Sequence, residues 1–237
     1  MNIQDSVILI TGANRGLGKA LVEAFVNAGA GKIYAAARDI NSLPNFGGTV
    51  FAVAMDVTDE ASINTALKST QDVTALINNA GVLSFGDVFS SPLQQWQQTF
   101  DVNTYGTLRL TQKFSPVIEQ NGGGQIINIL TLLSLASMPG MAAYNASKAA
   151  AWSINLSLRA SLAGKGIAIY GVFPGAIDTD MLAEVDMPKT SPSDVAQAVV
   201  NGVIEGNEDI FPDPMSKDVY AAWTQDHKAV EKQFAQM

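Results

Sequence analysis

Tyr144 and Lys148 stand one helical turn apart in the segment MAAYNASK, and this pair has the chemistry for proton transfer. Residues four apart lie on the same face of a helix, so the ammonium would stand beside the phenol. A free tyrosine has a pKa of about 10, and we expect the cation to stabilise the tyrosinate and lower that pKa. Such pairs also occur by chance, so the interpretation as a general acid/base depends on motifs elsewhere in the chain.

A glycine-rich segment near the start of the chain, TGANRGLGKA at 11–20, has the composition of a phosphate-binding turn. It follows an apolar run and precedes an amphipathic stretch, so it lies between a predicted strand and a predicted helix. The free amides of a helix N-terminus favour phosphate. A turn without a ligand is the alternative, but the position at the start of a βαβ unit favours a dinucleotide site. The cofactor-binding residues predicted here are Gly12, Asn14, Arg15, Gly16, Leu17 and Gly18.

The end of the second predicted strand indicates which dinucleotide binds. An acid usually stands there to hold the ribose 2′-hydroxyl, but this strand ends in Ala37 and is followed by Arg38. Arg15 in the glycine turn adds a second guanidinium, and two guanidiniums suit a 2′-phosphate. We therefore predict NADP(H) in preference to NAD(H). The alternative is that Arg38 is an ordinary surface arginine.

Strand and helix patterns alternate along the whole chain, which predicts an α/β fold. We expect a single domain over 1–237, a Rossmann fold whose doubly wound parallel sheet has about seven strands with helices on both faces. The predicted strands are 7–11, 32–37, 50–56, 75–81, 125–130, 167–175 and 208–213. The predicted helices follow the glycine turn and lie near 59–70, 92–120, 142–164, 192–206 and 215–235.

Composition excludes several classes of function. The net charge of −8 argues against a general nucleic-acid or anionic-membrane surface. The absence of cysteine excludes disulfides and thiolate catalysis, and with only His227 a histidine metal site is improbable, so no metal is expected. The N-terminus lacks a signal-peptide pattern and no apolar stretch has the length of a membrane span. These features predict a soluble, cytoplasmic protein.

The motifs together resemble the classical short-chain dehydrogenase/reductase family over nearly the whole chain. The resemblance is carried, in order, by Thr11-Gly12-x3-Gly16-x-Gly18, Asp56-Val57, Asn78-Asn79-Ala80-Gly81, Asn103, Tyr144-x3-Lys148 and Pro174-Gly175-x3-Thr179. It implies that Asp56 and Val57 contact the adenine and that Asn79, Ala80 and Gly81 approach the cofactor. It further implies that Thr179, after Pro174 and Gly175, holds the nicotinamide amide. Lys148 would reach the nicotinamide ribose, and Asn103 would hold a relay water beside that lysine.

A hydroxyl beside the tyrosine is also needed, because the substrate oxygen requires a second donor as charge develops on it. The family uses a serine just after the fifth strand, at a spacing that falls on Thr131 in this sequence. We predict Thr131 in this role, since threonine keeps the hydroxyl, although it is stiffer at χ1. Ser134 remains the alternative if the loop folds back.

Residues close to the catalytic motifs are the candidates for a substrate pocket, although each could equally belong to the core. They are Leu132, Ser134, Met141, Trp152, Met181, Leu182 and Val185. The segment near 176–192 is short, which predicts a pocket that is open or completed by another chain. The tail carries Trp223 and Phe234 and would either cover the pocket or bind a partner subunit.

The leading interpretation is an NADP(H)-dependent carbonyl reductase or alcohol dehydrogenase that acts on a small, mostly apolar carbonyl compound or alcohol. A reductase of 3-ketoacyl groups on a carrier protein is an alternative, but acidic carriers favour a basic rim and the net charge is −8. The third possibility is a non-catalytic NADP(H) sensor or scaffold. The family resemblance also implies a homodimer or homotetramer formed through the helices near 92–120 and 142–164.

Overall fold

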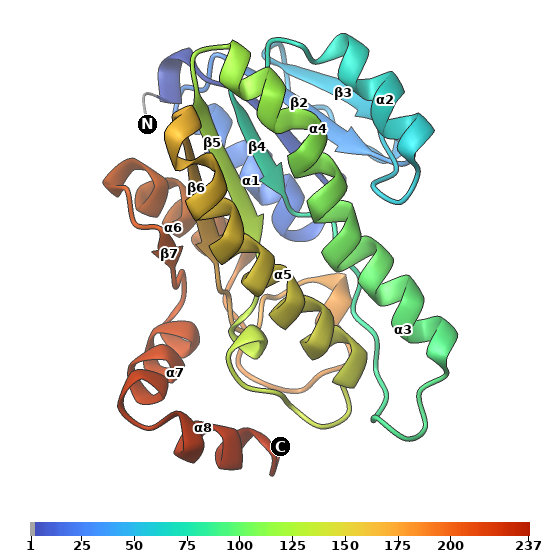
Figure 1. The fold of residues 1–237 in the computed structure, drawn as a ribbon, viewed down its shortest axis with the longest axis vertical. Helices are drawn as coiled ribbons and strands as arrows, with labels where there is room; N and C mark the ends of the chain where they lie inside the picture. Colours follow the sequence, from blue (N-terminus) through green and yellow to red (C-terminus); the bar gives the residue numbers. More distant parts are fainter. Residues whose placement is uncertain (1–2) are drawn as a thin grey trace.

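Seven parallel strands form one sheet in the computed structural model, which describes residues 3–237 (Figure 1). The strand order is β3-β2-β1-β4-β5-β6-β7, which confirms the predicted doubly wound α/β fold. The strands are β1 Val7–Thr11, β2 Lys32–Ala37, β3 Val50–Ala54, β4 Ala75–Asn78, β5 Gly124–Ile129, β6 Ile167–Val172 and β7 Asp209–Ile210. The order reverses between β1 and β4, and ligands of open α/β sheets bind at such a point.

Successive residues of each strand face opposite sides, so the sheet has two apolar layers. Ile8 and Ile10 of β1 pack against helices α1 Gly16–Asn27 and α6 Pro192–Glu205. Leu9 lies between them in sequence and packs on the other side, with helices α2 Glu60–Ser69, α4 Thr107–Gln120 and α5 Ala142–Leu162. In Figure 1, α4 and α5 lie in front of the sheet and α1 behind it.

Two of the predicted helices are interrupted. The segment predicted as one helix near 92–120 consists of α3 Leu93–Phe100, a π-helical turn Asp101–Gly106 and then α4. The predicted helix 215–235 is α7 Pro214–Gln225 followed by α8 His227–Phe234. The break falls at Asp226, whose carboxylate accepts hydrogen bonds from the amides of Lys228 and Ala229. An aspartate in this position begins a new helix.

Several strands are shorter than predicted at their carboxyl ends. Strand β3 ends at Ala54, β4 at Asn78 and β6 at Val172, and β7 is only Asp209–Ile210. The residues beyond these ends belong to loops at the carboxyl edge of the sheet and are no longer part of its strands. The predicted strands therefore included loop residues that lie at the candidate active site.

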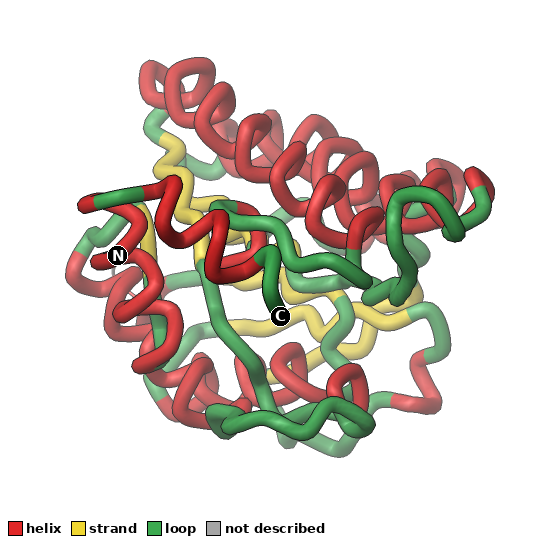
Figure 2. Tube along the Cα trace, turned by 90° about the horizontal axis from the view of Figure 1, so that it is seen from below, coloured by secondary structure: helices red, strands yellow, loops and turns green. Residues whose placement is uncertain are grey.

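The C-terminal helices α7 and α8 pack on the loop that follows β5. Val230 and Phe234 of α8 are buried against Leu132 and Ala136 of that loop. Figure 2 views the molecule from the side where β4 and β5 end, and the C-terminus lies over the middle of this face. This contact brings the tail next to the carboxyl edge of the sheet.

Within residues 3–237, no helix combines the length and the apolar character needed to cross a membrane. The same residues contain no cluster of three or more histidine, cysteine, aspartate or glutamate side chains with the arrangement of a metal site.

Candidate active site

A clamp between Thr11 and Asn79 joins the ends of β1 and β4. The Thr11 hydroxyl accepts hydrogen bonds of 3.0 Å from the amides of Asn79 and Ala80. The Asn79 side-chain amide donates in return to the Thr11 carbonyl at 2.8 Å and to the Gly12 carbonyl at 3.3 Å. These bonds hold the glycine turn against the loop after β4, on either side of the point where the strand order reverses.

The glycine turn has the shape of a cradle for a dinucleotide. Gly12 and Gly16 have φ angles of 64° and 52°, in the left-handed region that favours glycine. A Cβ on Gly18 would collide with the Gly12 carbonyl oxygen, so α1 begins as close to β1 as backbone contact allows. The first amides of α1 thus open into free space at a helix N-terminus, which fits a pyrophosphate.

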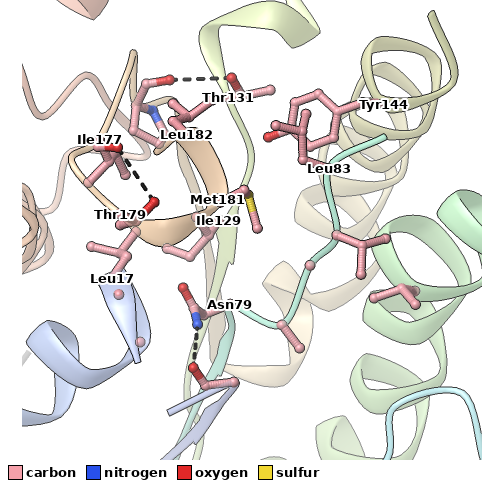
Figure 3. A pocket seen from close by; sticks show the side chains of 18 of the residues that line it. Leu17, Asn79, Leu83, Ile129, Thr131, Tyr144, Ile177, Thr179, Met181 and Leu182 are labelled. Atoms are coloured by element: carbon pink, nitrogen blue, oxygen red, sulfur yellow. Dashed lines mark hydrogen bonds between the residues drawn. The ribbon is translucent and has the colours of Figure 1, made fainter. Parts of the chain in front are cut away.

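One cavity of about 970 Å³ runs along the carboxyl edge of the sheet (Figure 3). Its volume is at the upper end of that of ordinary ligand sites. The structure brings every predicted cofactor-binding residue to its wall: Gly12, Asn14, Arg15, Gly16, Leu17, Gly18, Arg38, Asp56, Val57, Asn79, Ala80, Gly81, Tyr144, Lys148, Pro174, Gly175 and Thr179. A nicotinamide dinucleotide therefore fits the residues that line this cavity.

Arg38 and Asp56 line the end of the cavity that the family resemblance assigns to the adenosine, called the adenosine end below. Hydrogen bonds from Thr58 and the charge of Arg38 lower the Asp56 pKa despite its burial. Asp39 also lines this end, but its Oδ1 accepts bonds from the amide and side chain of Asn41 at 2.9 and 3.0 Å. One oxygen of its carboxylate is thereby engaged within its own turn.

Arg15 is paired with an acid from a distant loop. Its guanidinium lies 3.5 Å from Asp180, which follows Thr179 after β6. Both side chains are highly exposed, at 73% and 77%, so this ion pair contributes little and is readily exchanged. Arg15 can therefore turn to another anion in the cavity.

Tyr144 and Lys148 both line the cavity, but their electrostatics differ from the sequence prediction. Burial raises the pKa of Tyr144 to about 12, and the Thr131 hydroxyl is the group that opposes this rise. The Tyr144 pKa is therefore raised, whereas the sequence predicted a lowered value. The Lys148 ammonium donates instead to the Ile129 carbonyl at 2.7 Å, and burial lowers its own pKa to about 8.

Thr131 lies beside the tyrosine at the cavity wall, as Figure 3 shows. It begins the 3₁₀ turn Leu132–Ser134 and is 6% exposed. Its hydroxyl donates a long, 3.4 Å bond to the Pro174 carbonyl and accepts a 3.3 Å bond from the Leu133 amide. Bonds this long are weak, so the hydroxyl can turn to a ligand at little cost.

Asn103 lies behind the lysine and does not line the cavity. It occupies the π-helical turn, a feature found often at functional sites. Its side chain exchanges two hydrogen bonds with the backbone of Val82, of 2.8 and 2.9 Å, and donates to Ser147 Oγ at 3.0 Å. A Cβ placed on Gly81 would lie 3.3 Å from Asn103 Oδ1 and 3.7 Å from Lys148 Nζ. Gly81 thus lies close to both side chains.

Two predicted pocket residues do not line the cavity. The Ser134 hydroxyl is buried without a hydrogen-bond partner at the end of the 3₁₀ turn. Trp152 lies two turns after Tyr144, where the helical repeat has rotated it by about 80°. It packs edge-on against Phe173 and Trp223 instead. The other candidates do line the cavity: Leu132, Met141, Met181, Leu182 and Val185.

Sequence reasoning missed the contribution of α7. Asp213 is 1% exposed and caps α7 through the Ser216 amide, while its Oδ2 accepts a 2.8 Å bond from the Gly175 amide. Met215 in the first turn of α7 also lines the cavity. A Cβ on Gly175 would lie 2.9 Å from Asp213 Oδ1, so this glycine permits the close approach. The Asp-Pro pair before a helical pattern was the only local signal.

Comparison with known proteins gives consistent matches. The family model described as short chain dehydrogenase matches residues 6–189. The 2,3-dihydro-2,3-dihydroxybenzoate dehydrogenase of Escherichia coli is 36% identical over 188 residues, covering 76% of this chain and 73% of that protein.

Two solved structures from Burkholderia also match. A short chain dehydrogenase from Burkholderia cenocepacia in complex with NADP has a TM-score of 0.94 and 34% identity, over 99% of both chains. A short chain dehydrogenase/reductase from Burkholderia phymatum in complex with NAD has a TM-score of 0.85 and 25% identity, over 98% of this chain and 96% of that one.

Replacing Lys148 with methionine should stabilise the ligand-free protein. The Lys148 pKa of about 8, against 10.5 for a free lysine, corresponds to a cost of about 3 kcal/mol for the buried charge. Loss of the hydrogen bond to the Ile129 carbonyl destabilises the variant by about 1 kcal/mol, so its free energy of unfolding at pH 7 should rise by a net value of about 2 kcal/mol. Urea unfolding measures this gain.

The pH dependence of the Lys148→Met effect identifies its cause. The wild-type cost is fully present below pH 8 and disappears as pH rises from about 8 to 10.5, where the folded lysine is neutral and the unfolded one is still charged. The advantage of the variant should shrink over that window. Lys68→Met removes an exposed lysine and should change little. A gain that is independent of pH would contradict the electrostatic explanation.

Proposed function

The chain belongs to the short-chain dehydrogenase/reductase family, and we propose that it is an NADP(H)-dependent oxidoreductase that interconverts a ketone or aldehyde with its alcohol. One observation carries this proposal. Tyr144 and Thr131 lie side by side at the wall of the same cavity that the glycine turn lines. Titration with NADPH, followed by a panel of carbonyl compounds monitored by NADPH absorbance, tests it.

The proposed reaction needs a hydride at the carbonyl carbon and a proton at the oxygen. The cofactor, when bound, would supply the hydride. Tyr144 gives its phenolic proton to the oxygen, and its pKa of about 12 keeps that proton in place at neutral pH. In the reverse direction the same oxygen takes the proton from the alcohol.

The other residues hold the reacting oxygen and stabilise the charge on Tyr144. Thr131 donates a second hydrogen bond to the oxygen as negative charge develops there. Lys148 is charged below pH 8, and its ammonium favours the tyrosinate left after proton transfer. Asn103 acts as a positioning residue, because it anchors the Val82 backbone beside Gly81 and the lysine.

The preference for NADP(H) rests on Arg15 and Arg38. Both guanidiniums line the cavity, Ala37 leaves no acid at the end of β2, and the Asp39 carboxylate is engaged by Asn41. The similar Burkholderia cenocepacia protein was solved with NADP, while other similar proteins were solved with NAD or NADH. The proposal for this chain therefore depends on its own two arginines.

The proposal includes assembly into a homodimer or homotetramer in the cytoplasm. Apolar side chains are exposed on the outer helices, among them Leu93 of α3, Tyr105 of the π-helical turn and Leu156 of α5. A second copy that covered these helices would remove this surface from water.

Changing Ala37 to aspartate together with Arg38 to leucine should weaken NADPH binding by about tenfold to a hundredfold and spare or improve NADH. The change removes a guanidinium and adds a carboxylate that repels the 2′-phosphate. Dissociation constants for both cofactors are the measurement. Lys19→Leu removes an exposed cation of α1 that does not line the cavity, and it should leave both constants in place. Tighter binding of NADH by the unaltered protein would refute the assignment.

Tyr144→Phe should lower turnover by about a hundredfold to ten-thousandfold while NADPH binds nearly as before. The phenyl ring keeps the packing and only the proton donor is lost. Steady-state turnover and NADPH affinity are measured together. Tyr105→Phe removes a hydroxyl from the surface and should have no effect. Turnover of Tyr144→Phe within a few-fold of the parent would exclude the proposed role.

Thr131→Val should reduce turnover by about a hundredfold or more, because one donor to the developing charge is removed. Thr131→Ser should keep most of the activity, and Ser134→Ala should matter little because that hydroxyl faces the protein interior. Turnover of the three variants decides between the two hydroxyls. A large loss in Ser134→Ala with an active Thr131→Val would assign the role to Ser134.

A further inference from the structure

The methionines of this chain are concentrated at one place. Residues 3–237 contain seven, and all seven line the same cavity. Met55 lies at the adenosine end, next to Asp56 and Val57. The remaining six, which we call the methionine wall, are Met138, Met141, Met181, Met187, Met215 and Met237. The apolar layer between the sheet and helices α1 and α6 is built instead from isoleucine, valine, leucine, alanine, phenylalanine and tyrosine.

Three members of the methionine wall can be placed relative to the residues of the proposed reaction and its cofactor. Met141 precedes Tyr144 by three residues at the start of α5, so both share one turn. Met181 lines the same cavity as Ile129 and Tyr144, and Figure 3 labels all three. Met215 Sδ lies 3.0 Å from the position that a Cβ of Gly175 would occupy, at the end of β6. Four separate segments thus supply the same side-chain type to one surface.

Methionine gives this surface particular properties. Its side chain is unbranched, has three rotatable bonds and carries a polarisable sulfur, so it changes shape to fit different apolar groups. The branched side chains of the core have few rotamers and hold one shape. A wall of six methionines from loops and helix ends therefore favours apolar ligands without requiring one outline.

The charges around the cavity point to the same ligand class. Among the described residues that line it, the cations are Arg15, Arg38 and Lys148. Arg38 lies at the adenosine end near Asp56, Arg15 is paired with Asp180, and Lys148 is buried against Ile129. The loop after β6, which carries Met181 and Met187, adds Asp180 and Asp186 to the lining. An anionic substrate beside these methionines would therefore meet carboxylates, while Arg15 and Arg38 are assigned to the cofactor phosphates by the proposed function and Lys148 is buried.

We propose that the substrate is an uncharged, largely apolar carbonyl compound or alcohol, and that the methionine wall accepts such compounds over a range of shapes. This inference rests on the proposed function and narrows it. It argues against keto acids and against acyl groups carried on a phosphorylated arm, since both bring a negative charge to the methionine wall.

A matched pair of ketones tests the charge preference. 4-Acetylbenzoate and its methyl ester differ only in whether the carboxylate is free. The ester should be reduced with kcat/KM about a hundredfold or more above that of the acid, because the free carboxylate enters an apolar site without a partner. Equal or better use of the acid would overturn the inference.

A designed cation should reverse part of this preference. Met181 is 46% exposed at the cavity wall, so Met181→Lys places an ammonium there without burying it. The variant should raise kcat/KM for 4-acetylbenzoate about tenfold or more and lower it for the ester. Ala183→Lys adds the same charge on the same loop, at a residue that does not line the cavity, and should leave the ratio unchanged. An unchanged ratio in Met181→Lys would count against the proposed site of binding.

Methyl NMR of the protein labelled with [methyl-¹³C]methionine detects ligand binding at the methionine wall without requiring turnover. In the presence of NADP⁺ no hydride is available, and the methyl ester should shift the signals of the methionine wall while 4-acetylbenzoate should not. Signals are assigned by single Met→Leu variants, and Met55 serves as the internal control because it should respond to NADP⁺ alone. Equal shifts with both ketones, or shifts confined to Met55, would refute the inference.

These readouts separate failure of the inference from failure of the proposed function. If the ester shifts the wall signals but no ketone is reduced, the apolar site stands and the proposed oxidoreductase activity is wrong. If ketones are reduced but the acid is preferred, the activity stands and the substrate class is wrong.

Discussion

The close approach of α1 to the end of β1 is the constraint on which the remaining structure depends. Gly18 meets the Gly12 carbonyl with no room for a Cβ, and the Asn79 side chain reaches the carbonyls of Thr11 and Gly12 from the neighbouring strand. The Thr11 hydroxyl completes the clamp through two amides after β4. Because β1 and β4 lie where the strand order reverses, this clamp sets the geometry of the crevice into which all later loops project.

Burial acts on the two ionisable groups of the site in opposite directions. It raises the Tyr144 pKa to about 12 and lowers the Lys148 pKa to about 8, so each group is driven toward its neutral form. The tyrosine thus keeps its proton at neutral pH, and the lysine keeps its charge near neutral pH at a cost in stability. The stability supplied by the two apolar layers of the sheet offsets that cost.

The two ends of the cavity are built on different principles. The loop that carries Gly175 is fixed by hydrogen bonds such as that between the Asp213 carboxylate and the Gly175 amide. A fixed backbone suits the constant shape of the nicotinamide dinucleotide that we propose binds there. The part of the lining that we propose receives the substrate carries the flexible side chains of the methionine wall, and α8 packs on the loop after β5 that carries Met138. Flexible side chains on an anchored frame suit ligands that vary.

Local patterns in the sequence were sufficient to predict the alternating strands and helices of the α/β fold, the glycine turn and the helical pair Tyr144 and Lys148, because each depends on neighbours within a few residues. The direction of the Tyr144 pKa was not accessible in this way, since it depends on how much of the folded chain excludes water from the phenol. The break at Asp226 was visible only as a capping residue inside an otherwise helical pattern.

Tertiary packing alone decided which side chains face the cavity. Trp152 and Ser134 are close to the catalytic motifs in sequence but turn into the interior, whereas Met215 and Met237 are far away in sequence and reach the wall. Separation along the chain does not predict which of these residues reach the cavity, because this depends on how α7 and α8 pack on the loop after β5. The residue types were present in the sequence, and their convergence on one surface was a property of the folded protein.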